Sequence, residues 1–162
     1  MGPGGSPGLQ NRVCPDKSGR VGSTPTYSRF LPNKDVSVKN AILLLEDDLT
    51  ARDLMLKVIN SALSDLEQNV YIAENGNEAL NLIKSHGENI ILFTTDVIHP
   101  GIDTLELIKA AKMKNPQIKI MLITGSVTVE EEYGSQADFI LTKPFTNETF
   151  ADLLRLAFIQ NK

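Results

Sequence analysis

From residue 41 onward, short apolar runs alternate with longer stretches in which apolar residues recur at helical spacing. Such runs are typical of strands buried on both faces, and such spacing is typical of amphipathic helices. The pattern predicts strands at 41–45, 70–73, 90–93, 118–123 and 139–141. It predicts helices at 49–66, 77–85, 104–114 and 147–160, with a poorly defined segment between 124 and 138.

Helical spacing also predicts the buried faces of the first and last helices. In the first helix, one face is formed by Leu54, Val58, Ala62 and Leu66. In the last helix, the inward residues are Phe150, Leu153, Leu154, Ala157 and Phe158. We expect Asn147 to cap the last helix, with Glu148 in its first turn.

Strands that alternate with helices predict an α/β fold, with a doubly wound parallel sheet and helices on both faces. In such sheets, ligands bind beyond the carboxyl ends of the strands. Polar side chains follow four of the predicted strands at that edge. These are Glu46, Asp47 and Asp48 after the first strand, Asp96 after the third, Thr124 after the fourth and Lys143 after the fifth.

The residue types at this edge suggest phosphate chemistry. Carboxylates held close together repel one another unless a cation intervenes, and an all-oxygen site suits Mg²⁺. Asp96 could attack phosphorus, Thr124 could donate a hydrogen bond to a phosphoryl oxygen, and Lys143 could bind the phosphate as a point charge. Each residue alone also has an ordinary explanation as a helix cap, turn former or loop residue. His86 and His99 have no partner at metal spacing and are interpreted as surface or turn residues.

Residues 1–40 differ from the rest of the chain. They contain 16 Gly, Pro and Ser residues and no helical or strand period, which predicts a flexible linker or N-terminal extension before a domain at 41–162. The opening MGPGGS resembles a cloning remnant. The first 40 residues carry a net charge of +4, so residues 41–162 carry −8. An acidic domain is a poor candidate for direct nucleic-acid binding, which relies on Lys and Arg.

The location is suggested by features that the sequence lacks. No apolar run approaches the ~18 residues of a spanning helix, and the N-terminus shows no apolar secretory segment. Cys14 is the single cysteine and cannot form a disulfide within the chain. We therefore expect a reducing, cytoplasmic setting and no membrane span.

Four motifs in order, ILLLEDD, TTDVIHPGID, MLITGS and LTKPF, resemble the CheY-like receiver domain of two-component response regulators. The resemblance covers about residues 40–160 and implies the strand order 2-1-3-4-5. It implies that Asp96 is the phosphoacceptor, with Thr124 as the switch hydroxyl and Lys143 as the family lysine before a cis Pro144. It also implies a Mg²⁺ site formed by Asp47, Asp96 and the backbone carbonyl of Ile98. Glu46 would bind the metal through water, and Asp48 would not bind it directly.

The chain departs from the family pattern at three places. Thr104 stands where the family usually has Gly. Ile140 stands at the aromatic switch position, and the neighbouring Phe139 should point to the other side of its strand. The segment between Thr124 and Lys143 is about three residues shorter than usual, which predicts a short or irregular fourth helix.

The resemblance implies a receiver that takes a phosphoryl group from a phosphohistidine on a sensor histidine kinase or a histidine phosphotransfer protein. The chain ends about 20 residues after LTKPF. We therefore expect signalling by protein–protein contact, from a free-standing receiver or the C-terminal receiver of a hybrid kinase. Such a protein is not a conventional enzyme, because the phosphoryl transfer modifies its own Asp96.

Two other functions stay open from the sequence. One is a docking module that keeps the fold and no longer uses phosphate, an idea that the unusual segment 125–138 favours. The other is a hydrolase with an aspartyl nucleophile, which usually needs a second Asp two residues later. Here that position is Ile98, which cannot transfer a proton. The same apolar side chain predicts slow self-dephosphorylation.

Overall fold

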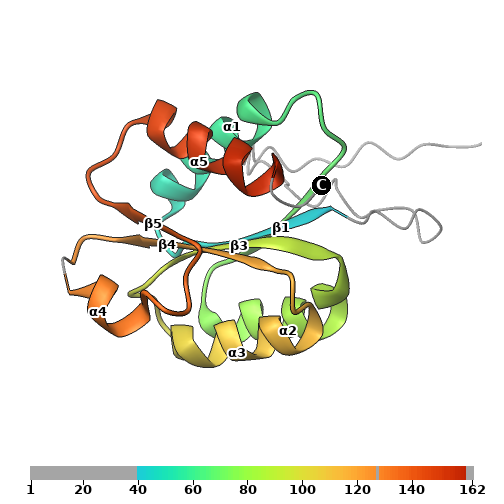
Figure 1. The fold of residues 1–162 in the computed structure, drawn as a ribbon, viewed down its shortest axis with the longest axis vertical. Helices are drawn as coiled ribbons and strands as arrows, with labels where there is room; N and C mark the ends of the chain where they lie inside the picture. Colours follow the sequence, from blue (N-terminus) through green and yellow to red (C-terminus); the bar gives the residue numbers. More distant parts are fainter. Residues whose placement is uncertain (1–39, 127, 160–162) are drawn as a thin grey trace, which may run out of the picture. The chain divides into compact units, whose positions relative to one another are not determined.

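The computed structural model describes residues 40–126 and 128–159, and shows a single parallel sheet between two layers of helices (Figure 1). The predicted extension, with Cys14, lies outside the described residues apart from Asn40. The order of the strands is β2-β1-β3-β4-β5, and every pair is parallel. This confirms the predicted fold class and strand order. The strands are β1 (Ala41–Leu45), β2 (Asn69–Ala73), β3 (Ile90–Asp96), β4 (Lys119–Thr124) and β5 (Phe139–Thr142).

Helices α1 and α5 cover one face of the sheet, and α2, α3 and α4 lie on the other (Figure 1). Helix α4 has only five residues, which confirms the prediction of a short fourth helix. No described helix has the length and apolar character needed to cross a membrane. The helices are α1 (Leu49–Ala62), α2 (Gly76–His86), α3 (Thr104–Lys114), α4 (Val129–Tyr133) and α5 (Asn147–Ile159), with a short 3₁₀ turn η1 (Gly87–Asn89).

Alternate residues of each central strand enter two separate cores. Ile42 and Leu44 pack under α1 and α5, whereas Leu43 and Leu45 pack under α2 and α3. Because both faces are covered, β1 is buried at all five positions, and this explains its unbroken apolar sequence. In β5, Phe139 and Ile140 likewise pack against opposite cores, as predicted.

The buried face of α1 differs from the prediction. Leu54 is 47% exposed, and Leu66 lies beyond the end of the helix with 39% exposure. A leucine-rich helix offers more than one apolar stripe, so spacing alone did not decide between neighbouring stripes. The helix buries Met55, Leu56, Val58 and Ile59.

The predicted N-cap of α5 was also wrong. The helix already includes Asn147, and the preceding Thr146 accepts a hydrogen bond from the backbone N–H of Thr149 at 3.1 Å. Thr and Asn are both good N-cap residues, and the capping residue is the one whose side chain reaches the first free N–H groups.

Candidate functional site

Three charged side chains meet at the carboxyl edge of the sheet. The Nζ atom of Lys143 lies 2.6 Å from Oδ2 of Asp96 and 3.5 Å from Oε2 of Glu46. The side chains of Glu46, Asp96 and Lys143 are 2%, 15% and 35% exposed. We call these three residues the charged cluster.

Strand register brings the charged cluster together. Leu45 of β1 pairs with Thr95 of β3, so the residues that follow them leave the sheet side by side. On the other side, the backbone N–H of Lys143 donates to the carbonyl of Thr124 at 2.7 Å, which continues the pairing of β4 with β5. The bond from Lys143 to Pro144 is cis, as the family resemblance implied.

Both oxygens of the Asp96 carboxylate are held. Oδ2 accepts from Lys143, and Oδ1 accepts from the backbone N–H of Ile98 at 3.1 Å. The buried hydroxyl of Thr95 donates to the Asp96 carbonyl at 2.6 Å, which fixes the backbone at the same point. The carboxylate therefore has a defined orientation at the end of β3.

The cluster shifts the pKa values of two of its members. Burial raises the pKa of the Glu46 carboxyl above its ordinary value, and the nearby Lys143 ammonium only partly offsets this. Burial alone would lower the pKa of Lys143, but the hydrogen bond and charge of Asp96, with Glu46, outweigh it and raise that pKa. Lys143 is thus held in its charged form beside Asp96.

Thr124 ends β4 beside the cluster. Its side chain is buried, and its hydroxyl oxygen accepts the backbone N–H of Ser126 at 2.9 Å. This contact uses the oxygen as an acceptor and leaves the hydroxyl hydrogen to be donated elsewhere.

Asp47 and Asp48 differ from the buried Glu46 because both are exposed. Asp48 caps α1, since its Oδ1 accepts the backbone N–H of Ala51 at 2.7 Å. Asp47 precedes this cap, and within residues 40–126 and 128–159 its side chain makes no hydrogen bond or ion pair. Its carboxylate is therefore free to bind a ligand.

The donor set fits a Mg²⁺ ion bound partly through water. Within the described ranges, no three His, Cys, Asp or Glu side chains are arranged to hold a metal by themselves. Mg²⁺ does not need such a set, because it keeps several waters and takes only one or two carboxylates. Oε2 of Glu46 is buried without a hydrogen bond and has only the ammonium of Lys143 at 3.5 Å. An unsatisfied buried carboxylate oxygen beside Asp96 is suited to accept from a metal-bound water.

The loop after β3 contains a contact that the sequence did not predict. His99, interpreted above as a turn residue, places Nε2 2.9 Å from the hydroxyl of Thr104, which is 1% exposed. That hydroxyl donates to the carbonyl of Val97 at 3.1 Å. The sequence offered one signal for this contact, because Thr104 replaces the usual glycine and lies five residues after His99. His86 has a different role and stacks on Tyr71 with ring centroids 4.6 Å apart.

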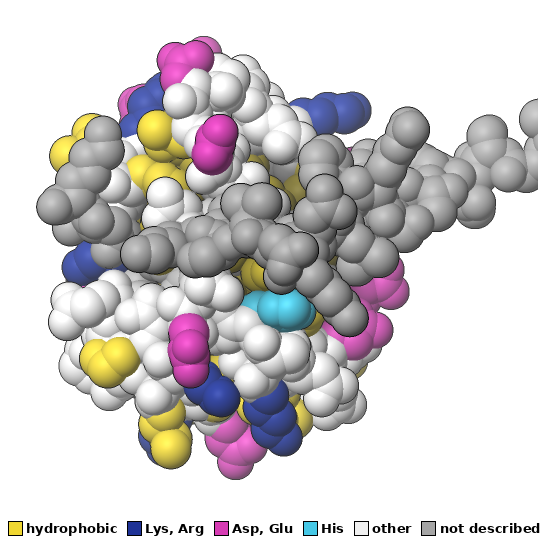
Figure 2. Space-filling view, turned by 90° about the vertical axis from the view of Figure 1, so that its right-hand side faces the viewer, with side chains coloured by type: hydrophobic (Ala, Val, Ile, Leu, Met, Phe, Trp, Pro, Cys, Tyr) yellow, Lys and Arg dark blue, Asp and Glu magenta, His cyan; other side chains and the backbone are white. Residues whose placement is uncertain are grey.

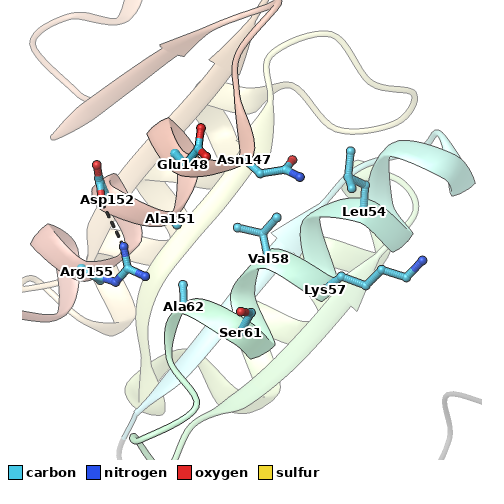
Figure 3. A pocket seen from close by; sticks show the side chains of 10 residues that line it. All are labelled: Leu54, Lys57, Val58, Ser61, Ala62, Asn147, Glu148, Ala151, Asp152 and Arg155. Carbon is cyan, nitrogen blue, oxygen red and sulfur yellow. Dashed lines mark hydrogen bonds and ion pairs between the residues drawn. The ribbon is translucent and has the colours of Figure 1, made fainter.

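A groove of about 480 Å³ lies between α1 and α5, away from the charged cluster (Figure 3). Its floor is apolar, and its rim carries both charges, with Arg155 paired to Asp152 at 2.9 Å. None of the three cluster residues lines it. Mixed charge is also visible on the uncovered surface in Figure 2, where acidic and basic side chains are interspersed. The groove residues are Leu54, Lys57, Val58, Ser61, Ala62, Asn147, Glu148, Ala151, Asp152 and Arg155.

Comparison with known families gives a match over most of the chain. Residues 42–155 match the model of the response regulator receiver domain. Among curated relatives, the response regulator receiver protein CpdR of Brucella abortus is 33% identical over 107 residues, covering 64% of this chain and 84% of CpdR. Transcription factor SKN7 of Chaetomium thermophilum is 30% identical over 122 residues. That match covers 72% of this chain and spans only 15% of the transcription factor.

Solved receiver structures share the fold. The response regulator TrrA of Thermotoga maritima, crystallised in complex with Mg²⁺ and BeF, is 27% identical with a TM-score of 0.59. The alignment covers 73% of this chain and 98% of TrrA. The receiver domain of AraT from Geobacillus stearothermophilus has a TM-score of 0.64 at 24% identity, with 75% and 94% of the two chains covered.

Proposed function

Because the chain belongs to the response regulator receiver family of two-component signalling, we propose that it accepts a phosphoryl group on Asp96 from a phosphohistidine. The observation that supports this most is the charged cluster, in which Lys143 contacts Asp96 at 2.6 Å beside the buried Glu46. A lone carboxylate at a strand end would need no buried acidic neighbour and no ammonium.

Asp96 is the proposed nucleophile. One of its carboxylate oxygens forms a bond to phosphorus while the bond from phosphorus to the histidine nitrogen breaks, and that nitrogen keeps the electron pair. The ammonium of Lys143 donates to Oδ2 of Asp96 at 2.6 Å. The hydrogen bonds from Lys143 and from the N–H of Ile98 orient the carboxylate before the donor arrives.

Lys143 and Thr124 are proposed to bind the transferred group. The raised pKa of Lys143 keeps its ammonium charged, so that it can move from Asp96 to a phosphoryl oxygen. The hydroxyl of Thr124 accepts from Ser126 and can donate its own hydrogen to a second phosphoryl oxygen. Donors placed where charge develops are a large source of rate enhancement in such transfers.

Asp47, Asp96 and the backbone carbonyl of Ile98 are the proposed Mg²⁺ ligands, with Glu46 binding a metal-bound water. When bound, Mg²⁺ supplies positive charge that neutralises the transferring phosphoryl group. Glu46 contributes a buried acceptor that no other described group satisfies. Asp47 contributes an exposed carboxylate one residue after the buried Glu46.

The proposed donor is a sensor histidine kinase or a histidine phosphotransfer protein, with a protein as the receiver of the signal. Residues 1–40 are proposed to be a linker or extension before the receiver at 41–162. The curated relatives differ in length: the matched region makes up 84% of CpdR and 15% of the SKN7 protein. A free receiver and a receiver within a larger protein are both compatible with those shares.

The test is phosphorylation by a small donor. The purified chain is incubated with acetyl phosphate and Mg²⁺, and its intact mass is measured beside Asp96→Ala. We expect a Mg²⁺-dependent, acid-stable and base-labile phosphate adduct in the wild type and none in Asp96→Ala. Asp152→Ala is the matched control, because it removes an exposed carboxylate on α5 far from the cluster and should keep the adduct.

An adduct that persists in Asp96→Ala would place the phosphate elsewhere and contradict the proposal. No adduct with acetyl phosphate, or with a phosphorylated histidine phosphotransfer protein, would favour the second candidate, a docking module that does not use phosphate. The five-residue α4 is the observation that favours this candidate.

A further inference from the structure

We propose that His99 and Thr104 are positioning residues that hold the loop after Asp96 in the geometry needed for metal binding and phosphoryl transfer. The inference rests on the proposed function and concerns the same site. The two side chains and the carbonyl of Val97 form a hydrogen-bonded clasp across residues 97–104. Ile98, whose carbonyl is a proposed metal ligand, lies inside this clasp.

The hydroxyl of Thr104 is the centre of the clasp. It is the side chain of the first residue of α3, and it is 1% exposed. It donates its single hydrogen to the carbonyl of Val97 at 3.1 Å, so it can only accept from His99. The Nε2 atom of His99, 2.9 Å away, must therefore carry a hydrogen.

The clasp joins the loop to a helix that is already fixed. Asp103 caps α3 by accepting the backbone N–H of Leu105 at 2.8 Å, so Thr104 belongs to a capped helix end. The ring of His99 reaches from the loop to this helix end, where its Nε2 lies 2.9 Å from the hydroxyl oxygen of Thr104. Residues on both sides of Ile98 are thus tied to the same point.

Helix α2 supports the loop from the other side. The backbone N–H of Gly76 donates to the carbonyl of Pro100 at 2.8 Å. A Cβ at Gly76 would lie 2.3 Å from the carbonyl oxygen of Ile102, so only glycine allows this approach. Gly101 completes the turn with a φ of +97°, a conformation that favours glycine. The loop is therefore packed between the beginnings of α2 and α3.

The clasp depends on a departure of this chain from its family. A glycine at position 104, the usual family residue, has no hydroxyl to receive His99 or to satisfy Val97. His99 and Thr104 therefore form a matched pair. Holding the loop before the metal and phosphoryl donor arrive reduces the ordering that binding would otherwise require.

Two matched pairs of variants test the clasp. In His99→Gln the side-chain amide can place its nitrogen near the Nε2 position, whereas the shorter His99→Asn can only imitate Nδ1. Thr104→Ser keeps the hydroxyl, whereas Thr104→Val keeps the shape and removes it. We expect His99→Gln and Thr104→Ser to behave like the wild type, and His99→Asn and Thr104→Val to lose the clasp.

The first measurement uses metal-free protein. Amide hydrogen exchange should become roughly fivefold faster at Gly76 and Ile98 in His99→Asn and Thr104→Val, because one hydrogen bond of ordinary strength is lost. The amide of Lys143, which donates to Thr124 across the site, is the internal control and should not change.

The second measurement is Mg²⁺ affinity by calorimetric titration, with acetyl phosphate modification as a third. Mg²⁺ binding should weaken about fivefold in the same two variants and recover in His99→Gln and Thr104→Ser. Suppose that amide exchange and Mg²⁺ affinity are unchanged in His99→Asn and Thr104→Val, while the wild type binds Mg²⁺ and is phosphorylated. That result would overturn the clasp and leave the proposed function intact. A wild type that neither binds Mg²⁺ nor accepts phosphate would overturn both.

Discussion

The loop after β3 and the segment after β4 leave neighbouring strands at the same edge of the sheet, yet they are held very differently. In the first, residues 97–104 are tied by side-chain and backbone hydrogen bonds to the beginnings of α2 and α3. In the second, residues 125–138 are tied to α3 and β4 near their end, through Gln136 and Asp138. The five-residue α4 before this point buries the apolar side chains of Val129 and Tyr133.

The difference suggests that the chemistry of the site and its readout are specified separately. The charged cluster and the clasp need defined distances and therefore many mutual contacts. Among its described residues the segment with α4 buries few side chains, and Ile140, in the following β5, stands where the family pattern has an aromatic residue. Few buried contacts permit motion and sequence change without loss of the chemistry.

The largest expected effect lies in the cluster. Lys143→Met removes the ammonium and keeps an unbranched side chain, so it should slow phosphorylation of Asp96 by acetyl phosphate about 100-fold. Rates are measured by intact mass at saturating Mg²⁺, with Lys119→Met as the control, since Lys119 pairs with Asp138 away from the cluster. A Lys143→Met rate within about threefold of wild type would remove Lys143 from the proposed mechanism.

The comparison is sharpened by Gly76 of α2, which packs against the loop after β3, and by Gly125 in the segment after β4. Gly76→Ala places a Cβ against the backbone of Ile102 and should cost about 2 kcal/mol in the free energy of unfolding. Gly125→Ala, after β4, meets nothing within 4 Å and should change it by less than about 0.5 kcal/mol. Urea unfolding measures both, and equal costs would break the distinction between the regions.

A smaller effect is expected from the core of α4. Val129 is 4% exposed, so Val129→Ala should lower the free energy of unfolding by about 1 kcal/mol through lost burial. The rate of Asp96 phosphorylation should stay within about twofold, because among the described residues no side chain of α4 is hydrogen-bonded to the charged cluster or to the loop after β3. A larger fall in that rate would show that α4 supports the chemistry directly.

The smallest effect tests the burial of Glu46. In the folded state the pKa of Glu46 is raised above the ordinary value of 4.5. The shift therefore stabilises the folded protein in acid, and this stabilisation is lost as the pH rises through the raised pKa. Metal-free Glu46→Gln should therefore melt at a higher temperature than wild type near neutral pH, with a difference that shrinks towards about pH 4. Thermal scans at several pH values measure this difference. A wild type that is the more stable of the two at neutral pH would contradict the assignment of burial as the main cause.

The sequence predicted most of the sheet because parallel strands that are buried on both faces have short, unbroken apolar sequences. It also predicted that Glu46, Asp96 and Lys143 would gather, since the carboxyl ends of parallel strands share one edge. The roles of Asp47 and Ile98 in metal binding stay predictions. The order of strands came from the family resemblance, because periodicity carries no information about which strands are neighbours.

What the sequence did not predict depends on distances that only the fold defines. The contact between His99 and Thr104 needs the turn at Gly101 to bring them together. The cap of α5 was assigned to Asn147, one residue late, because Thr146 is an equally good capping residue. The face of α1 was predicted only in part: Val58 is buried and Ala62 packs against the core, whereas Leu54 lines the groove beside α5 and is exposed.

The net charge of the cluster has a consequence for how phosphorylation and Mg²⁺ binding affect each other. With Glu46 and Asp96 ionised, the cluster holds two negative charges and one positive charge. A phosphoryl group on Asp96 would replace one negative charge by about 1.5 to 2, as judged from other phosphorylated side chains. Phosphorylation should then tighten the binding of Mg²⁺, and by thermodynamic reciprocity Mg²⁺ should stabilise the acyl phosphate by the same factor. The equilibrium fraction of phosphorylated protein would thus depend on the cation concentration around the protein as well as on its own residues.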